Sequence, residues 1–207
     1  LLRHALQAMI LAKQCGPGLI HRFVPEQGRR ARTKKTTIDN LRAVNIATII
    51  ASGNDGYVDS MGAPGCISSA ISVGSTWAKA GTDRCDAVSP PTSFLADDVS
   101  CFSTSTKFLS LLAPGSQINS SVVGGLYENY SGTSMATPHV AGAWAVLKQK
   151  KPTASVEEVF NAFVTTGKWV TDRRNGIAKP RIQVAQALAA ISANVSYALT
   201  VTKSGGG

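Results

Sequence analysis

The segment from Gly132 to Gly142, GTSMATPHVAG, combines residue types that suit nucleophilic catalysis. Its serine, Ser134, is expected in the first turn of a helix that runs from about Ser134 to Gln149. Unpaired backbone amides and the positive end of the helix dipole lie at such a position. A hydroxyl held there can attack a carbonyl carbon while the amides stabilise the oxyanion that forms. The competing interpretation is a purely structural helix start built from small residues.

A second polar segment follows an apolar one. Residues 46 to 50 form a nearly continuous β-branched run, which predicts a central parallel strand covered on both faces. The loop after it, residues 51 to 56, reads ASGNDG. Loops at the carboxyl ends of parallel strands are where α/β folds place ligands, and Asn54 could aim its side-chain NH₂ at developing negative charge. Taken alone, Gly-Asn-Asp-Gly also fits an ordinary turn.

Helical and strand patterns alternate from Thr37 onward, which is typical of an α/β fold. Asn45 is expected to stop a helix that ends near Val44. The chain from 77 to 98 is polar and is interpreted as a surface insertion. The other expected elements are strands at 70–75, 109–112 and 195–201, a hairpin of 118–123 and 126–130 turned by Gly124-Gly125, a helix opened by a capping box at Ser155 to Glu158, and a helix at 182–191.

Composition limits the class of protein. The chain has 207 residues, 43% of them hydrophobic, which is enough for one domain with a sizeable core and excludes a disordered chain. Its longest apolar stretches fall well short of the ~20 residues that cross a bilayer. The net charge is +9, but eight basic side chains against one acidic lie in residues 1 to 36. This basic run could attract phosphates, yet it lacks interleaved aromatic residues for base stacking, so nucleic acid is not the expected partner.

The GTSMATPHVAG segment resembles the serine motif of the subtilisin-like serine proteases, the subtilases (peptidase S8). Further landmarks of that family follow in order: Gly62 to Gly65 (GAPG), Val73-Gly74 and Ala113 to Gly115 (APG). The resemblance implies a three-layer α/β/α fold with a mostly parallel central sheet, incomplete at its N-terminal side. It also implies a role for each matching residue: Ser134 as the nucleophile, Asn54 as the oxyanion-hole donor, Thr133 beside the oxyanion site, Ala51, Ser52 and Gly53 as one wall of the substrate pocket, and Gly62 at its floor.

Two expected parts of a subtilase are absent. The family places an Asp in an Asp-Ser/Thr-Gly context and a His in a His-Gly-Thr context before this region, and neither motif occurs here. His139 lies five residues past Ser134, which turns it away from the nucleophile, so we interpret it as a packed, hydrogen-bonded structural histidine. We therefore expect a protease fragment that is inactive alone. The alternative is a catalytically dead subtilase remnant that acts as a binding module.

The resemblance divides the chain into three parts. Residues 1–36 are a basic segment that does not match the family, with a wrongly joined reading frame as one hypothesis for its origin. Residues 37–192 correspond to the C-terminal half of a subtilase catalytic domain. Residues 193–207 are interpreted as a linker or the start of a C-terminal accessory domain.

The family also suggests the setting in which the protein works. It implies a secreted, extracellular monomer that acts on protein or peptide substrates, without a membrane span and without a required cofactor, and with calcium as an optional structural ion. A disulfide between Cys85 and Cys101 would agree with secretion, and free buried cysteines are the alternative. Asp55 at the pocket rim could favour basic side chains. Three triplets, beginning at Asn119, Asn129 and Asn194, match the glycosylation pattern, which matters only in a eukaryotic secretory pathway.

Overall fold

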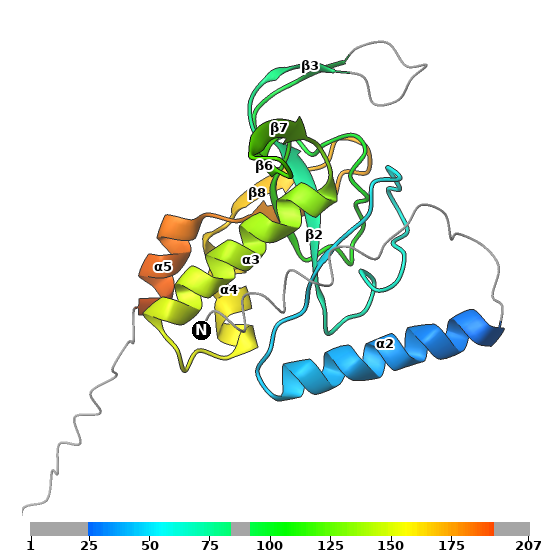
Figure 1. The fold of residues 1–207 in the computed structure, drawn as a ribbon, viewed down its shortest axis with the longest axis vertical. Helices are drawn as coiled ribbons and strands as arrows, with labels where there is room; N and C mark the ends of the chain where they lie inside the picture. Colours follow the sequence, from blue (N-terminus) through cyan, green and yellow to red (C-terminus); the bar gives the residue numbers. More distant parts are fainter. Residues whose placement is uncertain (1–24, 84–91, 193–207) are drawn as a thin grey trace, which may run out of the picture.

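A five-stranded sheet forms the centre of the computed structural model, which describes residues 25–83 and 92–192, without the side chains of 25–32, 83, 92 and 192. The strand order is β1-β2-β5-β9-β8. The first four strands are parallel, and β8 pairs antiparallel with β9 at one edge. The strands comprise β1 (Ile49–Ala51), β2 (Ile71–Trp77), β5 (Leu111–Ser116), β8 (Lys168–Thr171) and β9 (Ala178–Arg181) (Figure 1).

Helices cover both faces of this sheet. Helices α3 (Thr133–Lys150), α4 (Val156–Thr166) and α5 (Val184–Ser192) form one large apolar core with alternate residues of the strands, such as Ile49 and Val73. The intervening residue Ile50 points the other way and packs against Ile38 of helix α2 (Pro25–Ala43). Because strand side chains alternate between faces, this pattern makes a three-layer α/β/α arrangement. The predicted fold class is confirmed.

The turn between α2 and β1 ends the helix at Ala43, one residue earlier than predicted. The strand after it begins later in the chain than predicted, at Ile49. Asn45 adopts φ 64°, its N–H bonds the Arg42 carbonyl at 2.9 Å, and the Ile46 N–H bonds the Leu41 carbonyl at 2.8 Å. These two bonds form a Schellman motif, which confirms Asn45 as the stop. The predicted strand start at Ile46 was wrong, because the chain still completes this turn there and pairs with β2 only from Ile49.

The segment from 77 to 98 is not purely a surface insertion. Trp77 is the last residue of β2, is only 3% exposed, and stacks on Phe94 with ring centroids 3.6 Å apart. The two short antiparallel strands β3 (Gly81–Asp83) and β4 (Thr92–Phe94) bring Phe94 back over Trp77. An aromatic pair separated by a polar stretch leaves no periodic pattern, so the buried tryptophan was missed.

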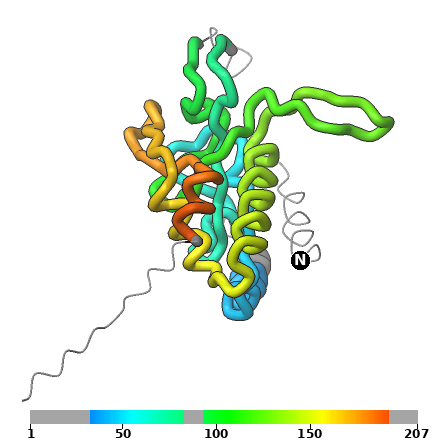
Figure 2. Tube along the Cα trace, turned by 90° about the vertical axis from the view of Figure 1, so that its left-hand side faces the viewer, coloured from blue at the N-terminus to red at the C-terminus, as the bar shows by residue number. Residues whose placement is uncertain are grey.

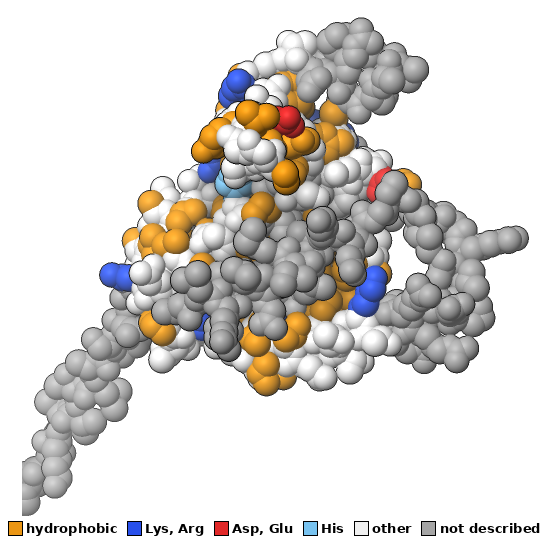
Figure 3. Space-filling view, in the orientation of Figure 1, with side chains coloured by type: hydrophobic (Ala, Val, Ile, Leu, Met, Phe, Trp, Pro, Cys, Tyr) orange, Lys and Arg blue, Asp and Glu red, His pale blue; other side chains and the backbone are white. Residues whose placement is uncertain are grey.

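Strands β6 (Ile118–Val122) and β7 (Leu126–Tyr130) form the predicted hairpin, and Gly124 and Gly125 take positive φ angles of 94° and 74°. The hairpin projects from the body of the protein (Figure 2). Hydrophobic side chains gather on it (Figure 3), and Val123 at its tip is fully exposed. In the ranges that the structure describes, no helix is long and apolar enough to cross a membrane.

Three strands differ from expectation in the second half of the chain. Strand β5 continues through Ala113-Pro114-Gly115, which had been interpreted as the residues that close it. Strands β8 and β9 were not predicted, because each carries a single buried residue among exposed or half-buried ones, and Pro180 lies within β9. β8 is the edge of the sheet and β9 is the strand next to it, and β-propensity is a weak guide to such short strands.

The predicted capping box at the start of α4 is present. The Ser155 hydroxyl accepts a bond from the Glu158 N–H at 3.0 Å, and the Ser155 N–H donates to the Glu158 carboxylate at 2.7 Å. Lys151 donates a further bond to this carboxylate at 2.7 Å. The Lys151 ammonium, then the Ser155 amide, lower the pKa of Glu158 from 4.5 to about 2. The ionised carboxylate is therefore preferred in the folded state.

This pKa predicts a window of acid sensitivity. Because the folded pKa lies below the unfolded one, the stabilisation by Glu158 is complete above about pH 4.5 and is lost as the pH falls towards about 2. The unfolding temperature of Glu158→Gln should thus lie below that of the wild type at pH 6, and this difference should shrink at pH 2. Glu157→Gln, which removes the neighbouring carboxylate that binds Arg42, is the charge-matched control. A difference that is independent of pH would contradict the assignment.

Candidate functional site

Ser134 is the second residue of α3 and is half-buried. The helix begins directly over the end of β5, where the Gly132 N–H donates to the Gly115 carbonyl at 2.8 Å. This close approach requires glycine, because a Cβ at Gly115 would lie 2.6 Å from the Ser75 hydroxyl and 2.7 Å from the Gly132 oxygen. The strand end and the glycine pair therefore set the position of Ser134.

The predicted oxyanion residue Asn54 lies beside this helix start. Its side-chain oxygen accepts two bonds from Thr133, one from the backbone N–H and one from the hydroxyl, both at 2.8 Å. The Gly53 N–H donates to the same Thr133 hydroxyl at 3.3 Å. Gly53 adopts φ 115°, which is a conformation that favours glycine and lets the chain turn out of β1. Thr133 thus ties the loop after β1 to the start of α3.

These bonds also settle which way the Asn54 amide faces. A backbone N–H can only donate, so the atom that meets Thr133 must be the amide oxygen. The NH₂ group is then on the other side, 3.2 Å from the point that a Cβ on Gly132 would occupy. Within residues 25–83 and 92–192, nothing accepts a bond from this NH₂.

The first turn of α3 supplies a second free donor. The Thr133 N–H is bonded to Asn54, and the Met135 and Ala136 N–H groups both point to the Gly132 carbonyl, at 2.9 and 3.4 Å. No side chain caps the helix, and the Ser134 N–H has no acceptor in the described part of the chain. Two unpaired donors, the Asn54 NH₂ and the Ser134 N–H, therefore lie close to one point, 3.2 and 3.7 Å from where a Cβ on Gly132 would be. If the Ser134 hydroxyl attacks a carbonyl carbon, the carbonyl oxygen becomes an oxyanion. These two donors can stabilise its negative charge.

The residues expected to line a pocket lie in the same region. Ala51 ends β1, and Ser52 is buried with its hydroxyl bonded to the Thr104 carbonyl at 2.8 Å. The segment that carries Gly62 runs beside β1, since a Cβ on Gly65 would lie 3.4 Å from the Ala51 oxygen. Gly62 itself faces open space, with no atom within 4 Å of an added Cβ.

His139 is exposed, so its interpretation as a packed residue was wrong, although its ring nitrogen Nδ1 does lie 2.8 Å from the Met135 carbonyl. It is the single histidine of residues 25–192, and it bonds its own helix rather than Ser134. The ring is exposed because position 139 lies on the face of α3 away from the sheet. The described residues therefore contain no imidazole base at the Ser134 hydroxyl.

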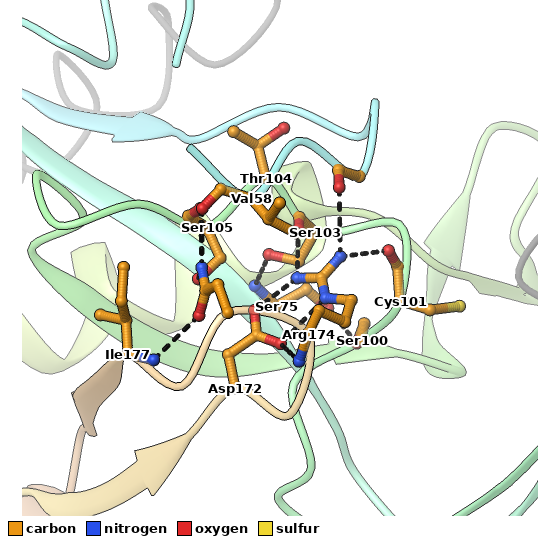
Figure 4. Close-up of polar contacts among 12 residues, drawn as sticks. Val58, Ser75, Ser100, Cys101, Ser103, Thr104, Ser105, Asp172, Arg174 and Ile177 are labelled. Carbon is orange, nitrogen blue, oxygen red and sulfur yellow. Dashed lines mark hydrogen bonds and ion pairs between the residues drawn. The ribbon is translucent and has the colours of Figure 1, made fainter. Parts of the chain in front are cut away.

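The turn between β8 and β9 was missed entirely. Asp172 and Arg174 point from it towards the loops that follow β1 and precede β5 (Figure 4). Asn175 donates from the same turn to the Val58 carbonyl. The sequence signal was the run DRRNG at 172–176, since Asn-Gly marks a hairpin turn. That signal indicates a turn but not its contacts with distant loops.

Two further predictions concern cysteines and metals. Cys101 is disulfide-bonded; Cys85, its predicted partner, lies outside the described residues, so the pairing stays a prediction. Cys66 is a free, exposed thiol. Across the described ranges, no group of three or more His, Cys, Asp or Glu side chains could hold a metal ion.

Comparison with known proteins gives a consistent result. A family model described as the subtilase family matches residues 15–186. An intracellular serine protease of Paenibacillus polymyxa is 42% identical over 111 residues, which is 52% of this chain and 29% of that protein. A subtilisin of Bacillus pumilus is 33% identical over 139 residues, 66% of this chain and 44% of that protein. The chain thus spans less than half the length of these two relatives.

Solved structures agree on the fold. A protease of Pseudoalteromonas arctica superposes with a TM-score of 0.60 at 24% identity, covering 76% of this chain and 46% of that one. The prenylagaramide maturation protease PagA superposes with a TM-score of 0.57 at 23% identity, covering 76% of this chain and 55% of that one. With the family model matching most of the chain, and the serine and asparagine segments meeting as described, this chain is a member of the subtilase family.

Proposed function

We propose that this chain carries the nucleophile and the oxyanion hole of a serine-type endopeptidase, as the C-terminal half of its catalytic domain. The observation that supports this most strongly is the pair of hydrogen bonds that Thr133 donates to the Asn54 side-chain oxygen. It turns the Asn54 NH₂ outward beside the unpaired Ser134 N–H, where an oxyanion needs donors. Membership of the subtilase family supports the same reaction class.

In the proposed reaction the Ser134 hydroxyl attacks the carbonyl carbon of a peptide bond. Asn54 and the Ser134 N–H hold the oxyanion of the tetrahedral intermediate, which collapses to an acyl-enzyme on Ser134 as the amine leaves. Ala51, Ser52 and Gly53 form one wall of the pocket for the residue before the cleaved bond, with Gly62 at its floor. The histidine base and the aspartate that orients it come from sequence outside this chain.

The requirement for an external base predicts a difference in labelling. A fluorophosphonate probe reacts with a serine that a histidine has activated. We expect it to modify Ser134 in a longer polypeptide translated from the upstream gene sequence, and to leave the 207-residue chain unmodified under the same conditions. The site of modification is read by peptide mass spectrometry. Rapid labelling of the isolated chain would contradict an external base, and no labelling of the longer polypeptide would contradict a protease.

The second candidate is a subtilase remnant that binds peptides without cleaving them. It is favoured by the lack of an imidazole at Ser134 among residues 25–83 and 92–192. If the upstream sequence lacks the Asp and His motifs in every reading frame, this candidate replaces the first. Retention of peptides by the chain, weakened by a bulky side chain at Gly62, would then identify the pocket as the binding site.

We further propose that the protein is secreted and acts as a monomer on protein substrates. The disulfide at Cys101 supports an oxidising compartment, and the subtilisin relatives agree with it. The relative from Paenibacillus polymyxa is named an intracellular serine protease, and this name argues against secretion. Thiol titration of the protein isolated from culture medium or cytosol, with and without reductant, distinguishes the two compartments.

A further inference from the structure

The turn between β8 and β9 makes contacts that reach well beyond its own hairpin. Arg174 and Asn175 extend from this turn to two loops that lie about 70 and 118 residues earlier in the chain. One loop follows β1 and carries Asn54, and the other is the segment 101–105 before β5 (Figure 4).

The Arg174 guanidinium binds one carboxylate and three backbone carbonyls. It forms a two-pronged pair with Asp172, with Nε 2.9 Å from Oδ1 and Nη2 2.6 Å from Oδ2. Nη2 also donates to the Ser103 carbonyl at 2.7 Å, and Nη1 donates to the carbonyls of Cys101 and Gly56, the latter at 3.5 Å. A planar fork with five N–H donors can serve this many acceptors, whereas a lysine ammonium cannot match the geometry.

Asn175, the residue after Arg174, also bonds both loops. Its NH₂ group donates to the Val58 carbonyl at 2.9 Å and to the Ser105 carbonyl at 3.2 Å. Its side-chain oxygen accepts from the Ile177 N–H at 2.9 Å, which fixes the orientation of the amide. Asn175 therefore holds the same two loops together at their far ends.

The two loops are in turn bonded to each other along their length. The Gly56 N–H donates to the Phe102 carbonyl at 2.8 Å, the Thr104 N–H to the Gly53 carbonyl at 2.9 Å, and the Ser105 N–H to the Tyr57 carbonyl at 2.8 Å. These bonds bracket Asn54 on both sides in sequence. The position of Asn54 thus depends on Thr133 on one side and on segment 101–105 on the other.

Asp172 holds the guanidinium in place. The carboxylate is only 2% exposed, and its burial raises the pKa, but the hydrogen bonds from the Arg174 side chain and backbone more than offset this, so that the pKa of Asp172 is below its ordinary value. A buried carboxylate that stays charged keeps its cation in one geometry. Backbone carbonyls in an irregular segment such as 101–105 need donors, and Arg174 supplies them.

We propose that Arg174, oriented by Asp172, is a positioning residue for the oxyanion loop: through segment 101–105 it fixes the Asn54 amide against Thr133. The structural part of this proposal stands alone, and its catalytic consequence rests on the proposed function. Arg174 touches none of the reacting groups, so it acts only through the backbone of the two loops.

The test measures the bond between Thr133 and Asn54 directly. In Arg174→Met the guanidinium donors are lost, and we expect the Thr133 backbone N–H of the full chain to exchange with deuterium at least about ten times faster than in the wild type. The Asn54 side-chain NH₂ signals in a ¹⁵N-resolved spectrum should also shift. The matched control is Arg181→Met, which removes a comparable Arg–Asp pair on β9: Arg181 bonds Asp97 and the Ile182 carbonyl, and it has no hydrogen bond to either loop.

The control separates positioning from general stability. Equal acceleration of Thr133 exchange in Arg174→Met and Arg181→Met, at equal unfolding temperature, would overturn the proposal. If Arg174→Met does not fold, Arg174→Lys keeps the charge beside Asp172 but not the fork, and it should show the same selective acceleration. An unchanged Thr133 exchange rate in Arg174→Lys would then count against the proposal.

Activity of the longer polypeptide separates this inference from the proposed function. If Arg174→Met accelerates Thr133 exchange while the longer wild-type polypeptide hydrolyses no peptide, the positioning role stands and the proposed function fails. If the longer polypeptide is active, Arg174→Met should lower kcat about tenfold or more relative to Arg181→Met, with KM changed less than twofold. If Thr133 exchange is faster in Arg174→Met but kcat is unchanged, the positioning role stands and its proposed effect on catalysis is refuted.

Discussion

Replacing Ser134 by alanine in the complete protease is expected to lower kcat about a million-fold. In the proposed mechanism the hydroxyl is the atom that forms the acyl-enzyme, so no other group can take its place. The magnitude is the one known for subtilisin, a member of the same family, where loss of the serine leaves only a residual ~10³ to 10⁴ over water. In free energy the loss corresponds to about 8 kcal/mol of transition-state stabilisation. Initial rates on a peptide anilide measure it.

The control for Ser134→Ala is a hydroxyl removed elsewhere. Thr165→Ala deletes a hydroxyl on the exposed side of α4 that bonds only the Asn161 carbonyl in its own helix. We expect its kcat to equal that of the wild type within a factor of two. If Ser134→Ala retained more than about one hundredth of the activity, Ser134 would not be the nucleophile.

The second large effect is expected at Asn54. Asn54→Leu in the complete protease should lower kcat by ~10² to 10³, again a magnitude taken from the oxyanion asparagine of subtilisin, with little change in KM. The physical reason is that, in the proposed mechanism, the NH₂ group bonds the oxyanion and not the ground-state carbonyl, so its loss raises only the barrier. Steady-state kinetics on one peptide substrate separate kcat from KM.

A pair of variants distinguishes the two ends of the Asn54 amide. Asn54→Asp retains an oxygen that can accept both Thr133 bonds, but it offers no donor and places negative charge beside the oxyanion, so its kcat should fall at least as far as that of Asn54→Leu. Thr133→Val removes the hydroxyl that donates to Asn54 and accepts from the Gly53 N–H, two neutral bonds of about 1 kcal/mol each, and should cost roughly thirtyfold or less. A larger loss in Thr133→Val than in Asn54→Asp would mean that Asn54 acts as a structural bridge and not as a donor.

Short-range patterns in the sequence were sufficient for several elements. Asn45 stops α2, the glycines at 124 and 125 turn the β6–β7 hairpin, and the Ser155 to Glu158 capping box opens α4 as predicted. In each case the residues that make the decisive bonds lie within a few positions of one another. Backbone propensity and local hydrogen bonds therefore specify these features without reference to the rest of the chain.

The family and the candidate nucleophile also came from the sequence, because GTSMATPHVAG and ASGNDG occur as contiguous segments in a fixed order. That these two segments lie side by side in the fold could be expected only from the resemblance to the subtilases. The bonds that join them link Asn54 to Thr133 across 79 residues, and they depend on β1 and β5 ending at the same edge of the sheet.

Tertiary structure alone decided the exposure of His139, the burial of Trp77, and the hydrogen bonds from Arg174 to two distant loops. The contacts of Trp77 and Arg174 join residues that are far apart in sequence, and the strands β8 and β9 that carry the turn at 172–177 have little apolar periodicity. Sequence by itself determined which residues could do the chemistry. Their geometry was decided by the packing of strands and loops, because a hydrogen bond between distant segments depends on where the whole sheet places them, and no local propensity encodes that placement.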